Sequence, residues 1–430
     1  MNIGRLTVSA LVLSFGVSLA TARVTLEECQ GLAYDNYPQL KQNRLIEMTT
    51  EYNLSNASKG YLPQITVSAQ ATWQNKVPSF PDEMKELYSK VGLDMTGLKK
   101  DQYKVGADIS QVIWDGGVIK NTKDAAKSEG ITRKANLEVE LYGIRDRVNS
   151  IYFGILILDE QIRLNDELQS MLRSNCDKIK AYIDNGVAMP SDLDAATAEL
   201  YSAMQTRTGL DASREAYKRM LSLFVNKNLV SEQFVKPVMP VINDNGYTGR
   251  PEMKLFESKR EQLSVQKKSV MTSLNPRIGA FAQGYYGKPG FDMFADMFGN
   301  KWSFNFMAGI KVQWNIGSFY TKNGSLKKIE TAGKDIDVMQ ETFLFNTGLQ
   351  ATNEQGEIDK VKRQMAQDRE IVRLRESVRL SSESKYANGV IDVNDLIRDI
   401  TSENQARINS TLHEIDMLKS LYDLKNIVGE

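Results

Sequence analysis

Apolar and polar side chains alternate without a break along Gln64–Gln74, and this pattern limits the possible folds more than any other feature of the chain. The odd positions from Ile65 to Trp73 are apolar, whereas each even position is a Gln, Ser or Thr. A period of two predicts a β-strand with one apolar and one polar face. The length and the terminal Trp suit a strand that crosses a membrane, which takes about 9–11 residues. A half-buried strand of a soluble β-sandwich would show the same alternation.

Three later segments repeat this alternation. In the second strand the apolar phase slips by one residue, and we expect a β-bulge near Ser110–Gln111. The segment 76–101 before it contains two prolines and many charges, and is predicted to be a long loop. The fourth strand is the most regular, because its apolar row runs from Trp302 to Trp314. The predicted strands are 63–75, 103–115, 276–287 and 302–315.

The alternation also places individual side chains. Arg277 and Lys311 stand on polar faces, and we expect them to point into the lumen of a wide barrel without a specific role. An aromatic residue at each end of an apolar row is what two membrane interfaces require. We therefore expect these aromatic residues to lie at the membrane interfaces: Trp73, Tyr103, Trp114, Trp302 and Trp314.

Two long segments without Pro show helical spacing of their apolar residues. Each predicts one helix of about 67 residues, about 100 Å long at 1.5 Å per residue, and such a length indicates coiled-coil packing rather than a globular core. Each segment ends at an Asn-Gly pair, which is a typical helix stop. The predicted long helices are 118–184 and 320–387, and the shorter ones are 25–60, with a break before Pro38, 191–226 and 392–426.

The same order of elements occurs twice. The segment Asn275–Ile278 repeats Leu62–Ile65 at an offset of 213 residues. We therefore predict two structural repeats, 23–248, which ends in a connector at 229–248, and 249–430. In each repeat one long helix is about as long as two of the shorter helices placed end to end. The helices can therefore pack side by side into a closed bundle of uniform length.

The composition argues against several classes of function. Lys plus Arg and Asp plus Glu number 54 each, so the net charge gives no reason to expect a nucleic acid partner. Only two Cys and one His are present, which argues against a zinc, haem or iron–sulfur site. The motifs GxxxxGK[ST], GxSxG and HExxH are all missing. We therefore expect no enzymatic activity, no cofactor and no nucleotide binding.

The first residues predict an export signal. Arg5 provides a positive start, Leu6–Leu19 is mostly apolar, and Ala20-Thr21-Ala22 fits a small-x-small cleavage site. We therefore expect 1–22 to be removed. No later apolar run reaches the roughly 18 residues of a spanning helix, so any membrane crossing is expected to use strands.

The number of strands constrains the state of assembly. Open sheet edges are not tolerated in lipid, and the smallest membrane barrels have about eight strands. Four strands per chain are therefore too few. Two chains would supply eight and three would supply twelve, and the strand pattern leaves both numbers open.

The chain resembles the TolC-type outer-membrane efflux protein family in five segments that occur in the family's order: TLEECQGLAYDNYPQLK, YLPQITVSAQ, ISQVIWDGG, YIDNGVAMPSDLDAA and YANGVIDVNDL. The resemblance implies a mostly α-helical chain with a β membrane segment. It implies a homotrimer with a shared twelve-stranded barrel in the outer membrane of a Gram-negative bacterium, surrounded by lipid, and a periplasmic tube of antiparallel coiled-coil helices. It further implies a periplasmic adaptor protein and an inner-membrane transporter as partners.

In this family the two helix turns form a periplasmic tip that narrows the pore. The resemblance assigns Asp395 to a ring of acids at the aperture, and Asp392, Asp395 and Asp399 share one helical face at i, i+3 and i+7. Threefold repetition would make a negative ring that favours cations. The alternative is that Asp392 only caps a helix and that the other acids are solvated.

Two positions depart from the family's closing contacts. Asp192 and Tyr386 match residues that help to hold the tip closed, but the expected basic partner is Ile391, and the second acid of the ring is Arg398. We therefore expect a different closure, in which Arg398 offsets Asp395 on the same helix.

The turns themselves match the sites where the adaptor binds. The matching residues are Gly186, Val187, Gly389 and Val390. Helix termination alone would also explain an Asn-Gly pair in each turn, and both roles are compatible.

Two smaller features have modest explanations. Met293 and Met297 could suggest copper, but two Met among aromatic residues are more typical of a packed loop. Cys29 and Cys176 are expected not to form a disulfide, because their helices place them far apart.

The sequence thus predicts a passive outer-membrane channel, the exit duct of a tripartite efflux or type I secretion system. The alternative is a periplasmic coiled-coil scaffold with a small soluble β-domain, which leaves the alternation Trp302–Trp314 unexplained. Drugs, metals, small molecules and proteins all remain candidate substrates, because partner proteins choose the substrate.

Overall fold

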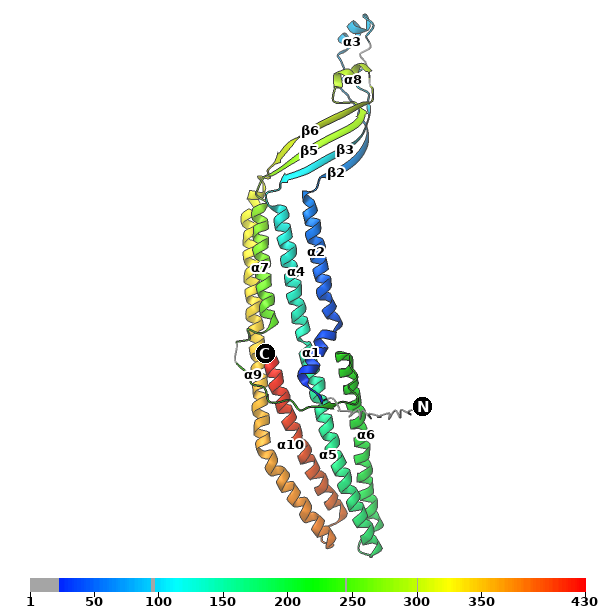
Figure 1. Ribbon diagram of the computed structural model, residues 1–430, viewed down its shortest axis with the longest axis vertical. Coiled ribbons are helices and arrows are strands. Elements are labelled where there is room, and N and C mark those ends of the chain that lie inside the picture. The colour runs from blue at the N-terminus through cyan, green and yellow to red at the C-terminus, as the bar shows by residue number, and fades with distance from the viewer. Residues whose placement is uncertain (1–22, 94–96, 244–245, 300) are drawn as a thin grey trace, which may run out of the picture. The chain divides into compact units, whose positions relative to one another are not determined.

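The computed structural model describes residues 23–93, 97–243, 246–299 and 301–430, and the expected export signal 1–22 lies outside them. The described chain is mostly helical with a few strands (Figure 1). It divides into two compact units, each assembled from separate stretches of sequence. The helical unit comprises the residues up to Leu40, Glu140–Arg250 and Asn346–Glu430, and the sheet unit comprises Lys41–Val139 and Pro251–Phe345.

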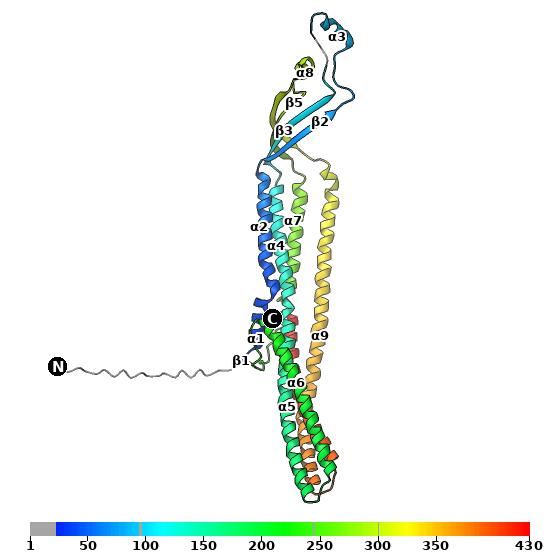
Figure 2. The ribbon, with the colours of Figure 1, turned by 90° about the vertical axis from the view of Figure 1, so that its right-hand side faces the viewer.

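Two helix pairs, each closed by a short turn, make up most of the helical unit (Figure 2). Helix α5 packs along α6, and α10 contacts both of them. The elements are β1 (Arg23–Val24), α1 (Leu26–Asn36), the 3₁₀ helix η1 (Pro38–Lys41), α5 (Ile144–Asp184), α6 (Pro190–Val225), β4 (Gln233–Phe234), the C-terminal part of α9 (Ser318–Ala387) and α10 (Val393–Val428).

Tyr152 of α5 anchors the first described residues in the core of this unit. Its hydroxyl group lies within hydrogen-bond distance of the carbonyl oxygens of Val24 (2.9 Å) and Val235 (2.7 Å), beside the parallel pair of β1 and β4. Burial raises the pKa of Tyr152. The side chain of Thr25 accepts a hydrogen bond from the amide of Glu28 at 3.2 Å and so caps α1.

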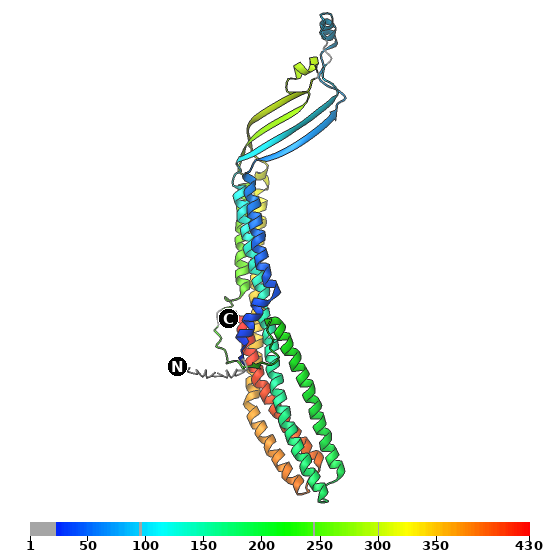
Figure 3. The same cartoon turned by 45° about the vertical axis from the view of Figure 1, so that its right-hand side comes forward.

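The sheet unit contains one antiparallel sheet of four strands (Figure 3). The strand order is β2-β3-β5-β6, so β2 and β6 are its edges. The elements are α2 (Gln42–Ser58), the 3₁₀ helix η2 (Lys59–Tyr61), β2 (Gln64–Trp73), α3 (Asp82–Ser89), β3 (Asp101–Trp114), α4 (Val118–Tyr142), α7 (Pro251–Thr272), β5 (Arg277–Lys288), α8 (Met293–Gly299), β6 (Ser303–Gln313) and the N-terminal part of α9.

The expected bulge in β3 is real but lies further along the strand than predicted. Cross-strand pairing stays in register through Val112, and the shift falls between Val112 and Trp114. Gln111 therefore shares the apolar row with Ala280. Its side-chain amide donates to the carbonyl of Tyr61 at 2.5 Å, and this bond satisfies a polar group where the sequence pattern predicted a phase slip.

Two other predictions about the elements were also wrong. The segment 76–101 contains the short helix α3 rather than only a loop. The single helix predicted over 118–184 is two helices that meet at Gly143. Gly disfavours a helix interior more than any residue except Pro, so a break at this position has a physical reason.

The apolar face of the sheet is uncovered in the described chain. Val67 of β2 and Phe304 and Ile310 of β6 expose 75, 73 and 72% of their surface. At one end of this face the ring centroid of Trp302 lies 6.1 Å from that of Tyr103 and 5.3 Å from that of Tyr286. An apolar surface of this kind marks contact with lipid or with another apolar partner.

The loop between β5 and β6 folds back over the polar face. Tyr285 and Asn305 are cross-strand neighbours on that face. The side-chain oxygen of Asn305 accepts from the amide of Phe291 at 2.6 Å, and the ring of Phe291 meets that of Tyr285 edge-on at 5.3 Å. Asp296 of α8, which is buried, accepts from the amide of Gly290. These bonds give the loop a defined structure on the polar side of the sheet.

Candidate functional site

The turn between α5 and α6 is built from local backbone bonds that leave its tip bare. Gly186 has a φ of +70°, which suits the left-handed position that ends a helix. The amide of Val187 donates to the carbonyl of Tyr182 at 2.8 Å. The side chain of Asp192 accepts from the amide of Met189 at 3.0 Å, so its carboxylate stabilises the start of α6. Val187 itself remains 65% exposed.

The turn between α9 and α10 has the same construction. Gly389 has a φ of +68°, and the amide of Val390 donates to the carbonyl of Lys385 at 2.9 Å. Asp392 caps α10, because its side chain accepts from the amide of Asp395 at 2.9 Å. The capping role considered for Asp392 is therefore confirmed. Val390 is 68% exposed, so each turn presents one bare Val.

Tyr386 joins the two turns. Its ring lies 6.0 Å from that of Tyr182, and it packs on the buried cluster of Ile179, Ala196 and Val393. The hydroxyl oxygen is buried and has no hydrogen-bond partner among the described residues. Burial, and then the nearby negative charge of Asp192, raise the pKa of Tyr386. Asp192 is therefore close enough to Tyr386 for its charge to act on the hydroxyl group, whereas the role of the two residues in closing the tip stays a prediction.

The acids of α10 are offset by a base on the same helix. The guanidinium group of Arg398 lies 2.9 Å from a carboxylate oxygen of Asp395 and 3.6 Å from one of Asp399. Asp399 also accepts from the hydroxyl group of Ser382 on α9 at 2.6 Å. The expected pairing of Arg398 with Asp395 is present, and it reduces the negative charge that this face presents.

A second polar cluster, which the sequence analysis missed, lies further along α9 and α10. Glu403 is fully buried and binds the guanidinium groups of Arg379 and Arg407, the latter at 2.7 Å. Arg407 also lies 3.6 Å from a carboxylate oxygen of Glu167 on α5. Burial alone would lower the pKa of Arg379, but hydrogen bonds to Glu403 and Glu383 outweigh it and raise the pKa. The cluster ties three helices together.

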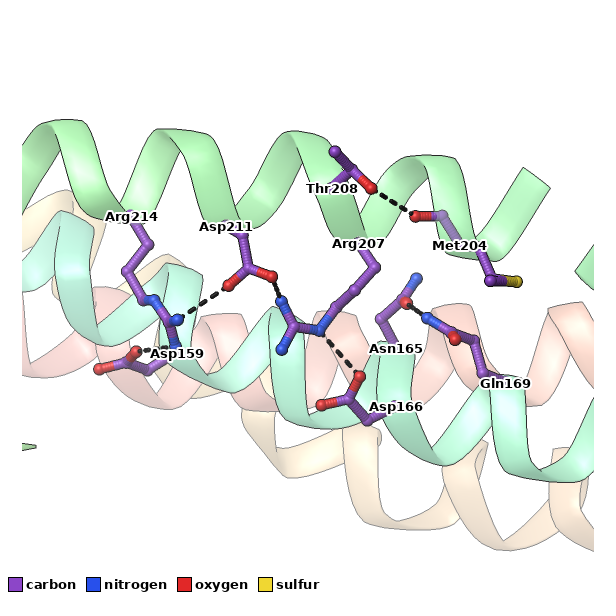
Figure 4. A network of polar contacts seen from close by, with 9 residues as sticks. All are labelled: Asp159, Asn165, Asp166, Gln169, Met204, Arg207, Thr208, Asp211 and Arg214. Atoms are coloured by element: carbon purple, nitrogen blue, oxygen red, sulfur yellow. Dashed lines mark hydrogen bonds and ion pairs between the residues drawn. The ribbon is translucent and has the colours of Figure 1, made fainter. Parts of the chain in front are cut away.

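Ion pairs also join α5 to α6, as Figure 4 shows. Arg207 of α6 contacts Asp166 of α5 at 2.8 Å. Arg214 of α6 contacts Asp159 of α5 at 3.3 Å and Asp211 of its own helix at 2.8 Å. These pairs are partly exposed, so each stabilises the helix pair only modestly.

The strand ends carry the predicted aromatic residues. Trp73, Trp302 and Trp314 expose 70, 45 and 55% of their surface. The indole N–H of Trp314 donates to the carbonyl of Leu274 at 2.8 Å, so the ring has one polar contact and one bare apolar side. Tyr103 and Trp114 are also exposed. Amphipathic rings of this kind suit a membrane interface.

The two Met and two Cys considered in the sequence analysis have different surroundings. Met297 is buried and Met293 is exposed in α8. Among the described residues, no cluster of three or more His, Cys, Asp and Glu side chains is placed to hold a metal ion. Cys29 and Cys176 are both free thiols, and burial raises the pKa of Cys29 to about 12.

Comparison with known proteins gives a match to one family model. Residues 31–223 match the family model described as outer membrane efflux protein, whereas no curated protein matches the sequence. Among the helices of the described residues, none is long and apolar enough to cross a membrane.

Three crystal structures share the fold. A membrane protein from Pseudomonas aeruginosa aligns with a TM-score of 0.67 and 14% identity over 94% of this chain and 90% of its own. The outer membrane protein VceC from Vibrio cholerae gives 0.66 and 13% over 94 and 96%. The CmeC outer membrane channel from Campylobacter jejuni gives 0.63 and 15% over 100 and 93%. At these identities the similarity shows the fold alone.

Proposed function

We propose that this chain, of which residues 31–223 match the outer membrane efflux protein family model, is the exit duct of a tripartite efflux or type I secretion system. The family's channels conduct substrates and catalyse no reaction. In this proposal a periplasmic adaptor and an inner-membrane transporter deliver the substrate and supply the energy, and this chain provides the passive route across the outer membrane.

One observation supports the proposal above all others: the four-stranded sheet has a bare apolar face and two open edges. A sheet edge in lipid must be paired. Three chains would pair every edge in a twelve-stranded barrel, and two chains would form one of eight strands. We propose the trimer, as the family resemblance implies, with the polar face lining the lumen.

The repeats and the export signal belong to the same proposal. We propose that 23–248 and 249–430 are structural repeats, each of which adds two strands to the barrel. Residues 1–22 would direct the chain through the inner membrane and then be removed.

The two turns are proposed as the periplasmic aperture and as the adaptor contact. The aperture would be formed by Asp192, Tyr386, Asp392, Asp395, Arg398 and Asp399. The exposed side chains of Val187 and Val390, beside Gly186 and Gly389, would contact the adaptor. Bare apolar side chains on short, well-defined turns suit docking, because little conformational entropy is lost when they bind.

The native mass of the protein extracted from outer membranes in detergent tests the proposal. Three protomers in the membrane fraction, after subtraction of the bound detergent, are expected. A monomer or dimer in the soluble periplasmic fraction would contradict the channel, and would favour a periplasmic coiled-coil scaffold with a small β-domain instead.

A further inference from the structure

A hollow of about 350 Å³ lies on the polar face of the sheet, next to the start of α4. Cross-strand pairing explains its shape. Gly279 of β5 sits between Val112 of β3 and Lys311 of β6, and it has no side chain to fill the space. Phe281 of β5 covers Gly309 of β6, since its ring atoms lie 3.0 Å from where a side chain at Gly309 would begin. The hollow therefore has a backbone floor and one aromatic wall.

Two cationic side chains line this hollow without a partner. Neither Arg277 nor Lys311 makes an ion pair with any described residue, and both are exposed. The register places Arg277 opposite Gln313 and Lys311 opposite Gly279, so the two cations lie one row apart on neighbouring strands. Because both side chains stand on the same face of the sheet, their positive charges add.

The one carboxylate that lines the hollow is already engaged. Asp115 is buried, and its two oxygens accept hydrogen bonds from the amides of Gly117, at 2.9 Å, and of Ile119. It therefore stabilises the start of α4, and it makes no ion pair with Arg277 or Lys311.

We propose that this hollow binds organic anions that carry an aromatic body, such as aromatic carboxylates. The anionic group would lie between Arg277 and Lys311, where charge-assisted hydrogen bonds are strong, and the aromatic body would pack against Phe281. A volume of about 350 Å³ falls in the range of small-molecule sites. The placement of the hollow in the lumen rests on the proposed function, whereas binding itself does not.

In the trimer, three such sites would attract anionic substrates on their way out. Polar and charged side chains that line a pore tune its selectivity. The hollow would therefore favour the anionic members of a mixed set of exported compounds over cationic ones of equal size.

Equilibrium dialysis of the detergent-solubilised protein tests the site directly, with 1-naphthoate as the probe and 1-naphthylmethylammonium as its cationic counterpart. We expect the wild type to bind naphthoate and not the ammonium compound. The double variant Arg277→Gln/Lys311→Gln should bind naphthoate about tenfold or more weakly, since two charge-assisted contacts are lost. Lys104→Gln is the matched control on the same face, because its amine stands over the ring of Tyr285 outside the hollow, and it should bind as the wild type does.

Two further measurements keep the result interpretable. Arg277→Lys/Lys311→Arg retains both charges and should restore binding, which shows that loss in the Gln variant is not a folding defect. Equal naphthoate binding by the wild type and by Arg277→Gln/Lys311→Gln would overturn the proposal. Naphthoate block of single-channel current is a separate readout: a protein that binds naphthoate but forms no channels would contradict the proposed function and leave the site intact.

Discussion

At the scale of single residues, the carboxylate of Glu403 depends on its two guanidinium partners. It is fully buried, and Arg379 beside it exposes only 12% of its side chain. A buried charge that loses its partner is costly, whereas an exposed ion pair contributes little. The cluster should therefore be sensitive to the removal of a single charge.

We expect Glu403→Gln to lower the free energy of unfolding by about 3–5 kcal/mol, because it leaves Arg379 and Arg407 without their shared carboxylate. Urea unfolding in detergent, followed by helix content, measures the change. Glu370→Gln on α9 is the control, since it removes only an exposed pair with Arg373, and it should have no measurable effect. Equal stability of Glu403→Gln and the wild type would show that the cluster is dispensable.

Tyr386 is expected to make the free energy of unfolding fall at alkaline pH. Its pKa in the folded protein is raised above the ordinary value of 10.0. Ionisation of this hydroxyl group therefore opposes folding: the free energy of unfolding is unaffected below the ordinary pKa of 10.0, and it falls as the pH rises from there through the folded pKa.

Between neutral pH and a pH above about 10, we expect the free energy of unfolding to fall less for Tyr386→Phe than for the wild type, because Phe cannot ionise. Urea unfolding at a series of pH values measures this difference. Tyr152→Phe is a poor control, since it also removes hydrogen bonds to Val24 and Val235. Parallel pH profiles of Tyr386→Phe and the wild type would contradict the prediction.

At the scale of helices and strands, the start of α10 sets the charge at the proposed aperture. Asp392 serves as a cap, and Asp395 is paired with Arg398. The ring is therefore less negative than a count of acids suggests, and the two members of the pair should act in opposite directions on ion selectivity.

We expect Asp395→Ala to lower the cation preference of the channel, because it removes one negative charge and leaves only Asp399 beside Arg398, and Arg398→Ala to raise it. Reversal potentials across a planar bilayer with a salt gradient measure both shifts. The two variants control for each other, since a shift in the same direction would indicate a change of pore width. Unchanged selectivity in both would contradict the ring.

The elements also show what the sequence can predict. Strands were found because a period of two survives wherever one face is bare, as in β6. The bulge in β3 was misplaced, because the bond from Gln111 to the carbonyl of Tyr61 is a contact across 50 residues of sequence. The cluster around Glu403 was missed for a similar reason. Its i, i+4 pairs resemble a solvated helix face, and the partners that α9 and α5 supply, Arg379 and Glu167, are far away in sequence.

At the scale of the whole molecule, both units are assembled from stretches far apart in sequence. The pairing of β3 with β5 joins residues on either side of the entire segment from α4 to α7. Contacts of such high sequence separation form slowly, because long loops must close first. The sheet is therefore expected to form late, after the local helix pairs.

The open edges of β2 and β6 have a consequence for biogenesis. In the proposed barrel, a single protomer could not enter the bilayer alone with two unpaired edges, so insertion and association would be one event. The rate of insertion into vesicles should then rise more steeply than in proportion to protomer concentration. Detergent-folded monomers that have not yet associated should be prone to aggregate. A rate strictly proportional to concentration would mean that one chain inserts by itself. In a cell that makes less of the protein, the number of assembled channels would thus fall more than in proportion to the amount of chain, since assembly depends on encounters between chains.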